Sequence, residues 1–356
     1  MTKHYDGCLM SFTRRDFLKL GSSTLSVAAL GPLSTISPGW DGRDLLDAIT
    51  LGRITRQDTP VYQEPDFDSP RLERLTRDEL IDLLDTVNSP HGPAHNPRWY
   101  RLEQGYIHSA YVQRIDSVHI NPPLTQVTAR GFVGEITVPY TQTTYKNRLG
   151  QWVPLYRLYY GSLHWVTAVD SGPEDERLYT LYDDWLRVRY RVRAEHLRPV
   201  ASSHFRPLSS DVAPQQKRLE VSIERQTLTA FEGREIVRET TVSTGRRWTP
   251  TPVGDFQIDR KHPSRHMGNG GLTSDLRAYE LVGVPWVSFF QSAGIAFHGT
   301  FWHDNFGEPM SLGCVNLRTQ DAQWLFRWST PVFQSQSDDQ PTYRVVEKGG
   351  TRVVVV

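Results

Sequence analysis

The sequence is poor in cysteine, with only 2 in 356 residues and no Cys-x-x-Cys pair. Cys8 lies in an N-terminal segment with the features of an export signal, which leaves Cys314 as the one thiol expected in a processed chain. An unpaired thiol is a liability in an oxidising compartment. Cys314 is therefore either a nucleophile, which its context favours, or a buried and inert side chain that acts as a small hydrophobe.

An excess of charge of one sign is also absent, because 40 basic residues balance 40 acidic ones. The balance excludes the basic electrostatic pattern of a nucleic-acid-binding protein. Long apolar runs are missing as well. The best candidate, Leu20 to Leu33, has about 14 residues, whereas about 20 are needed to cross a bilayer.

That short apolar run follows Thr13 to Lys19, a segment that resembles a twin-arginine export signal. We therefore expect residues 1–35 to direct export, and an uncleaved signal would act as a membrane anchor. Long helical patterns are few. Aromatic residues make up 11% of the chain, and 26 glycines and 23 prolines are spread as turn residues, which predicts a mainly β fold with many short strands.

Two related units precede the C-terminal region. The first covers residues 50–116 with Thr59-Pro60-Val61-Tyr62 near its start, and the second covers residues 131–200 with Thr137-Val138-Pro139-Tyr140. Each has an alternating strand, a turn, a further short strand and a one-turn helical element. This pattern resembles the bacterial Src-homology-3-like barrel and predicts two small β-barrels that serve as spacers or bind wall peptide.

The candidate chemistry lies in Phe297-His298-Gly299-Thr300 and in Ser311-Leu312-Gly313-Cys314-Val315-Asn316. Residues 299–313 separate His298 from Cys314, and a segment of this length can fold back so that the two side chains meet. We therefore expect the imidazole of His298 to act as base for Cys314. A predicted helix from Leu317 to Trp328 would place Cys314 just before a helix N-terminus, where the dipole favours the thiolate. The backbone N–H groups of Gly313 and Cys314 are candidate oxyanion donors.

The compound pattern resembles the signature of the YkuD-type L,D-transpeptidases over residues 217–333, which also includes Thr249 to Phe256. The resemblance implies a β-sandwich-like catalytic domain in which Cys314 is the nucleophile and His298 the general base, oriented by the carbonyl of Gly299. The family usually has histidine at the position of Leu312.

Other residues take roles from the same resemblance or from their place beside the motif. It implies that Ser311 and Asn316 shape the cysteine loop and that Arg318 contacts a substrate carboxylate. Trp302 and His303 are expected beside the substrate, and His303 is interpreted as a loop histidine bonded to local backbone rather than as the base.

The glycine-containing segment from Lys261 to Gly271 predicts a mobile flap in which His266 and Met267 touch substrate. The alternative is a surface loop that has no contact with substrate. A zinc site made of His298, His303 and Cys314 is the competing interpretation of these ligand types. The acyl-transfer pattern explains them better, so we expect no metal and no organic cofactor.

The resemblance implies transpeptidation of peptidoglycan stem peptides outside the cytoplasm, in the cell wall or periplasm. Cys314 would form a thioester that the amine of a second stem resolves, linking two third-position residues. An L,D-carboxypeptidase using the same thioester and a catalytically decayed wall-binding protein are the alternatives. The tail, residues 334–356, ends in a strand from Thr351 to Val356 that is expected to pair with a barrel or with the catalytic sheet.

Overall fold

The computed structural model of the protein describes residues 50–333 and 350–356, so the expected export signal in residues 1–35 lies outside the described residues. Short strands dominate this part of the chain, and the expectation of a mainly β fold is confirmed. In the same residues, no helix combines the length and apolar character needed to cross a membrane.

The first β unit runs from β1 to β8 and contains two sheets, with strand orders β4-β1-β8 and β3-β2-β7-β6-β5. Its elements are β1 (Thr50–Ile54), β2 (Thr59–Tyr62), β3 (Arg71–Leu75), β4 (Leu80–Leu83), β5 (Asp85–Asn88), β6 (Arg98–Arg101), β7 (Tyr106–His108), the 3-10 helix η1 (Ser109–Tyr111) and β8 (Val112–Ile115).

The second β unit runs from β9 to β15 and forms one sheet with the strand order β11-β10-β14-β13-β12-β9-β15. Its elements are β9 (Phe132–Ile136), β10 (Tyr140–Lys146), β11 (Trp152–Tyr159), β12 (Leu163–Ser171), β13 (Arg177–Asp183), β14 (Val188–Arg193), η2 (Ala194–His196) and β15 (Leu197–Pro199). Each unit contains the expected one-turn helical element, and a further short strand, β8 or β15, follows it.

The C-terminal unit contains two sheets and one α-helix, and the 3-10 helices η3 (Ser202–Phe205) and η4 (Pro214–Gln216) lead into it. The first sheet has the order β18-β17-β16-β24-β19 and the second β20-β21-β22-β23. The bounds are β16 (Lys217–Ser222), β17 (Thr227–Glu232), β18 (Glu235–Thr241), β19 (Gly254–Gln257), β20 (Arg260–Gly268), β21 (Glu280–Gln291), β22 (Ile295–Gly299), β23 (Val315–Leu317), α3 (Thr319–Trp328) and β24 (Arg352–Val355).

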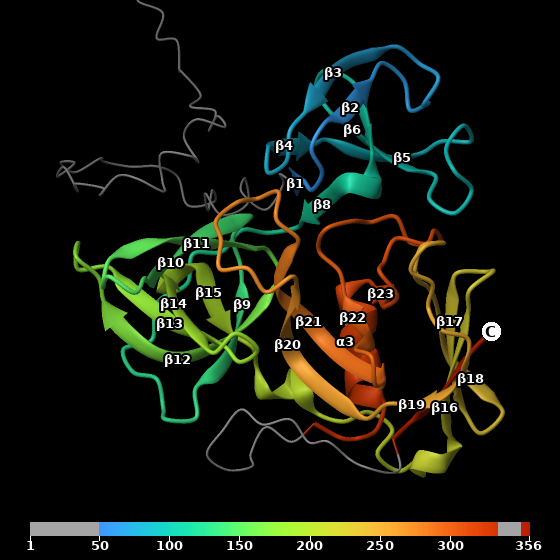
Figure 1. The fold of residues 1–356 in the computed structure, drawn as a ribbon. Coiled ribbons are helices and arrows are strands. Elements are labelled where there is room, and N and C mark those ends of the chain that lie inside the picture. The colour runs from blue at the N-terminus through green and yellow to red at the C-terminus, as the bar shows by residue number, and fades with distance from the viewer. Residues whose placement is uncertain (1–49, 334–349) are drawn as a thin grey trace, which may run out of the picture. The chain divides into compact units, whose positions relative to one another are not determined.

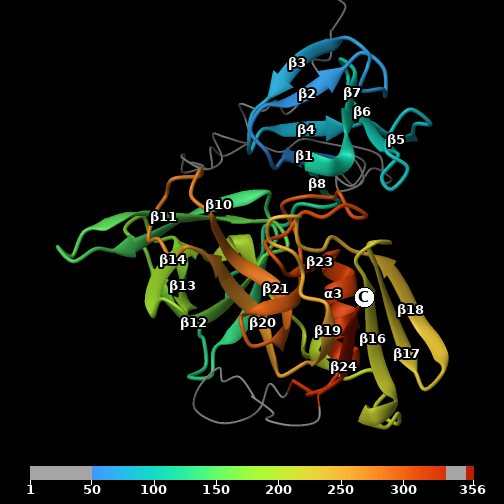
Figure 2. The ribbon, with the colours of Figure 1, turned by 45° about the vertical axis from the view of Figure 1, so that its right-hand side comes forward.

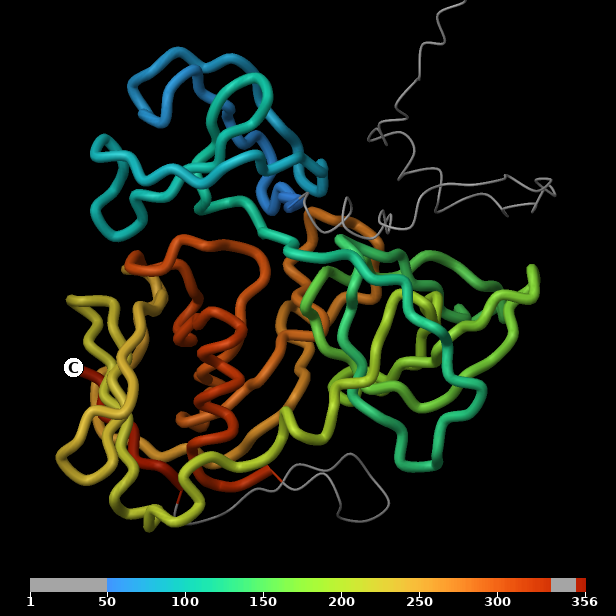
Figure 3. Tube along the Cα trace, turned by 180° about the vertical axis from the view of Figure 1, so that it is seen from behind, coloured from blue at the N-terminus to red at the C-terminus, as the bar shows by residue number. Residues whose placement is uncertain are grey.

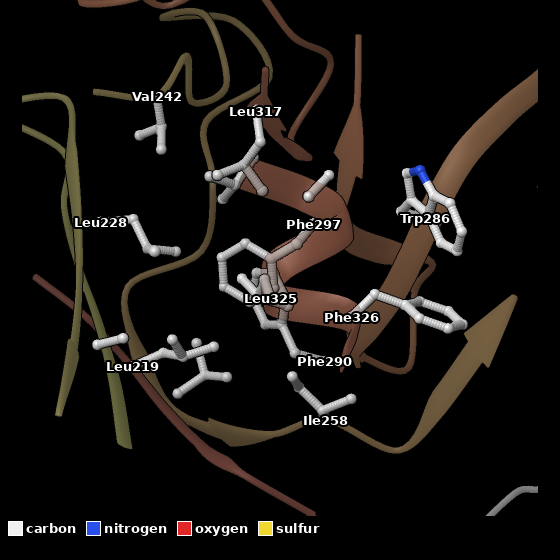
Figure 4. Packing of buried hydrophobic residues seen from close by; sticks show 14 of the residues in the cluster. Leu219, Leu228, Val242, Ile258, Trp286, Phe290, Phe297, Leu317, Leu325 and Phe326 are labelled. Carbon is white, nitrogen blue, oxygen red and sulfur yellow. The ribbon is translucent and has the colours of Figure 1, made fainter. Parts of the chain in front are cut away.

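Helix α3 lies between the two sheets of the C-terminal unit, as all three views show (Figures 1, 2 and 3). Its buried face presents Leu325 and Phe326 to Phe297 and Trp286 of the second sheet, and Leu219 and Leu228 come from the first (Figure 4). Burying each of these side chains stabilises the fold by about 1.5–3 kcal/mol, so this shared apolar core fixes the sheets against the helix.

The terminal strand β24 belongs to the first sheet of the C-terminal unit. It pairs in parallel with β16 and antiparallel with β19, with Val353 opposite Leu219 and Phe256. Of the two kinds of partner left open by the sequence, the strand therefore pairs with the C-terminal unit and not with a barrel. Because β24 is an interior strand, its valines have no free edge on which to aggregate.

Candidate active site

The strands β22 and β23 bring the two motif segments together. They pair in parallel, with Phe297 opposite Val315 and His298 opposite Asn316. His298 lies near the end of β22, and Cys314 directly precedes β23.

Strand alternation assigns the side chains of these two strands to opposite faces. Phe297, Val315 and Leu317 point into the core with α3, whereas Ala296 and Cys314 share a second apolar cluster. His298 and Cys314 are thus on the same face of adjacent strands, two residues apart in register. The fold therefore places the predicted base and the predicted nucleophile on one surface.

The Cys314 thiol has an apolar setting. It is half-buried and packs against a buried apolar cluster that includes Ala296, as do Met267, Leu281 and Trp302, and its Sγ lies 3.8 Å from the carbonyl oxygen of Gly294. Burial raises the pKa of the Cys314 thiol to about 11, against a smaller lowering by the Ala296 backbone N–H. The thiol is therefore neutral at pH 7.

The predicted thiolate stabilised by a helix N-terminus is wrong. Helix α3 begins at Thr319 rather than Leu317, and β23 separates it from Cys314. A helix dipole acts mainly within its first turn, so it does not compensate for the loss of water around the sulfur.

The His298 imidazole is held by its own neighbour. Its Nδ1 lies 3.1 Å from the carbonyl oxygen of Gly299, which fits an Nδ1–H donor and leaves Nε2 unprotonated. Burial lowers the pKa of His298 to about 4, although the Gly299 carbonyl acts to raise it. Trp302 packs on the ring at 5.7 Å between centroids. His298 is therefore a neutral imidazole available to accept a proton.

The cysteine loop is pinned by hydrogen bonds to the segment before β19. Thr251 Oγ1 donates to the carbonyl of Gly313 at 2.8 Å and accepts from the N–H of Gly245. Ser311 Oγ donates to the carbonyl of Cys314, and the N–H of Gly313 donates to that same hydroxyl at 3.0 Å. The Gly313 amide is therefore not free as an oxyanion donor, and the Cys314 N–H is the remaining candidate.

Gly313 is required by its conformation. Its φ is +121°, and a Cβ there would lie 2.8 Å from Cδ1 of Ile295. A residue with a side chain would be strained and would displace Ile295 of β22. Beside it, Leu312 is 56% exposed, at the position where the resembled family usually has histidine.

His303 and Asn316 form a buried pair beside His298. Nδ1 of His303 accepts the N–H of Asn305 at 3.2 Å, so the neutral ring carries its hydrogen on Nε2. Nε2 lies 2.9 Å from the side-chain amide of Asn316, and its N–H can donate only to the oxygen of that amide. The interpretation of His303 as a histidine bonded to local backbone is confirmed, and both of its ring nitrogens are engaged.

The guanidinium of Arg318 already has partners within the protein. It donates to Thr241 Oγ1 at 2.9 Å and lies over the ring of Phe306 at 4.6 Å. A substrate carboxylate would have to compete with both contacts, so its predicted role stays a prediction.

The predicted mobile flap over residues 261–271 is wrong, because Arg260–Gly268 is strand β20. His266 is buried between two carboxylates and cannot reach a substrate, whereas Met267 packs in the Cys314 cluster. The loop lies further on, between β20 and β21.

Two residues near the thiol were missed by the sequence reasoning. Tyr279 is partly exposed, and its pKa is raised by burial and further by its electrostatic interaction with Cys314. Arg246 is exposed, its N–H donates to the carbonyl of Ser311 at 3.0 Å, and its charge acts on both Tyr279 and His303. The doublet Arg246-Arg247 just before Thr249 was the available signal.

The region that holds this site matches one family model and is similar to several known proteins. Residues 216–355 match the YkuD family, described as the L,D-transpeptidase catalytic domain. L,D-transpeptidase 1 of Mycobacterium tuberculosis is 31% identical over 115 residues, which are 30% of this chain. The matched region spans 43% of that relative, so the chain covers less than half of its length.

Solved structures that show some likeness to this chain include two L,D-transpeptidases. A crystal structure of an Enterococcus faecium L,D-transpeptidase is 22% identical, with 40% of this chain and 50% of that chain covered and a TM-score of 0.30. An L,D-transpeptidase from Mycobacterium smegmatis is 19% identical, with 48% and 74% covered and a TM-score of 0.32.

Proposed function

We propose that the chain is an exported peptidoglycan L,D-transpeptidase that works through a thioester on Cys314. The observation that carries the proposal is the shared face of β22 and β23, on which His298 and Cys314 lie two residues apart inside the region that matches the catalytic-domain family. We also propose that the two preceding units are Src-homology-3-like barrels and that residues 1–35 direct export.

In the proposed first step, His298 Nε2 takes the thiol proton as Sγ attacks the carbonyl carbon of the third stem residue. The Cys314 N–H donates to the oxyanion of the tetrahedral intermediate. His298 then gives its proton to the leaving nitrogen, so that D-alanine departs as an amine and a thioester remains.

In the second step, the amine of a neighbouring stem attacks the thioester. His298 accepts the proton of the attacking nitrogen and returns it to the sulfur as the C–S bond breaks. The product is an amide between two third-position residues, and the thiol and imidazole are both restored to their neutral forms.

The pKa values set the cost of activation. With the thiol at about 11 and the imidazole at about 4, transferring the proton alone costs on the order of 9 kcal/mol. A turnover near one per second corresponds to a barrier of about 17 kcal/mol. The ion pair is therefore a transient species formed on the way to attack and is not the resting state.

The test is acylation of the full chain by a carbapenem, followed by intact-mass measurement, and formation of cross-linked dimer from purified stem tetrapeptides. We expect one adduct on the wild type and none on Cys314→Ala, with unchanged melting of the variant. Dimer formation by Cys314→Ala at the wild-type rate would defeat the proposal. Product that consists only of tripeptide, even with excess acceptor amine, would indicate a carboxypeptidase.

A second candidate is a wall-binding protein that has lost catalysis. The raised thiol pKa and the exposed Leu312 favour it. It predicts no carbapenem adduct on the native chain and labelling of Cys314 only after unfolding.

A further inference from the structure

The second β unit reaches the loop between β20 and β21 through three buried ionisable side chains, named here the Asp183–His266–Glu280 chain. Asp183 Oδ2 lies 2.5 Å from Nδ1 of His266, and Nε2 of His266 lies 2.8 Å from Glu280 Oε2. All three side chains are almost fully shielded from water, at 1%, 2% and 6% exposure.

Aromatic rings shield the Asp183–His266–Glu280 chain from solvent. Tyr156 and Trp185 of the second β unit present their edges to His266, with centroids 5.3 and 5.2 Å away. Burial acts to raise the pKa of Asp183, but the hydrogen bond with His266 and those from backbone N–H groups lower it overall. Asp183 is therefore a buried carboxylate whose charge depends on His266, and such pairs are costly to break on one side.

Both carboxylates at the ends of the Asp183–His266–Glu280 chain accept hydrogen bonds from backbone N–H groups. Asp183 Oδ1 accepts the N–H groups of Trp185 and Leu186, each at 3.0 Å. Glu280 accepts the N–H groups of Gly271 at 2.6 Å and Gly270 at 3.2 Å. One rigid connection thus runs from the turn after β13 to the β20–β21 loop.

A second hydrogen bond from the second β unit holds the β20–β21 loop in the same position. The Tyr156 hydroxyl of β11 donates to the carbonyl of Gly271 at 3.1 Å. The backbone of the loop is therefore hydrogen-bonded to the second β unit as well as to β20 and β21.

The loop held in this way borders the thiol. Met267 and Leu281, one at each end of it, pack against the same buried apolar cluster as Cys314. Within the loop, the backbone carbonyl of Tyr279 accepts the N–H of Asn269 at 3.1 Å, and the Tyr279 side chain interacts electrostatically with Cys314. Movement of the loop would therefore change both the cover of the sulfur and the surface that meets a substrate.

We infer that Asp183 is a positioning residue for Cys314: through His266 and Glu280, the second β unit fixes the β20–β21 loop beside the nucleophile. The inference rests on the proposed function for its effect on acyl transfer. It replaces the expectation of a passive spacer with a unit that completes the active site.

The test compares Asp183→Asn with Asp184→Asn in the full chain. Asp184 is the adjacent acid at the same contact, but it pairs with Arg265 at 2.7 Å and makes no bond to the loop. We expect Asp183→Asn to lower the carbapenem acylation rate of Cys314 at least tenfold and to raise iodoacetamide alkylation several-fold. Asp184→Asn should stay within twofold of the wild type in both assays.

Hydrogen exchange separates loop positioning from general destabilisation and from the proposed function. Peptides that cover residues 268–280 should lose protection in Asp183→Asn, while those from β16 and β17 keep it. This outcome does not depend on any transpeptidase activity, so a wild type that is not acylated defeats the function and leaves the positioning testable.

Glu280→Gln is the second variant if Asp183→Asn fails to fold. It keeps an acceptor for the loop amides and removes the charge toward His266, and we expect the same rise in exchange over residues 268–280. Unchanged exchange and reactivity in the folded variant, or equal losses in Asp184→Asn, would overturn the inference.

Discussion

Single residues decide how the candidate site is activated. Cys314 has a raised pKa and His298 a lowered one for the same reason, because both lose water on the shared face of β22 and β23. Desolvation favours the neutral form of each group. The site therefore rests as thiol and imidazole, and a bound substrate must accompany the proton transfer.

This resting state predicts the pH dependence of alkylation. Since only the thiolate reacts and the pKa of Cys314 is about 11, its rate with iodoacetamide should rise about tenfold per pH unit from pH 6 to 9. Mass spectrometry of the Cys314 peptide distinguishes it from Cys8. His298→Gln should give the same slope, and a plateau below pH 8 in the wild type would reveal a stable ion pair instead.

A second prediction at this scale concerns Arg246. Its exposed guanidinium should attract anionic reagents to Cys314, so Arg246→Gln should lower the iodoacetate-to-iodoacetamide rate ratio about threefold. The effect should shrink in about 1 M salt. Arg247→Gln is the matched control, since that guanidinium lies over the ring of Trp248 at 5.2 Å. Equal ratios in both variants would remove Arg246 from the site.

At the scale of elements, strand β24 connects the end of the described chain to the centre of a sheet. Its neighbours β16 and β19 come from much earlier in the sequence, and they lie on either side of it. Val353 and Val355 are buried in the core with α3, whereas Val354 faces the other way. The sheet that supports the catalytic core is therefore completed only when the last strand is added.

We expect Val353→Ala to lower the free energy of unfolding by about 2 kcal/mol, because it leaves a cavity in the core. Val354→Ala changes the same atoms on the less buried face and should cost less than about 0.5 kcal/mol. Urea denaturation monitored by hydrogen exchange of β16 and β24 measures both. Similar losses in the two variants would contradict the assigned faces.

At the scale of the whole molecule, buried neutral histidines make the fold sensitive to acid. Burial lowers the pKa of five of them to about 3 or 4: His164, His196, His262, His298 and His303. The unfolded chain binds protons at these groups near pH 6.5, whereas the folded chain does not. Stability is thus complete above about pH 6.5 and falls as the pH drops toward 4.

Each histidine should remove about 1.4 kcal/mol of stability per pH unit in that window. Total stabilities of proteins are about 5–15 kcal/mol, so we expect cooperative acid unfolding near pH 5. Melting temperatures measured between pH 8 and 5 test this, and His196→Gln should flatten the slope. A melting temperature that is constant to pH 5 would contradict the shifts.

The sequence was sufficient for the features that depend on near neighbours. The glycine, proline and aromatic content predicted the mainly β fold, and helical spacing from Leu317 to Trp328 predicted α3 to within two residues. The segments around His298 and Cys314 also indicated a base and a nucleophile, because residue type and spacing are local properties.

The tertiary structure decided the rest, since it depends on groups that are distant in the chain. The proton affinity of Cys314 follows from its burial against an apolar cluster of β21 and β22, and no local pattern encodes that loss of water. Arg318 is engaged by Thr241, and His266 by Asp183, only because folding brings segments that are distant in the sequence into contact. The sequence by itself therefore determined which atoms could react, and long-range packing determined their charge, their cover and their partners.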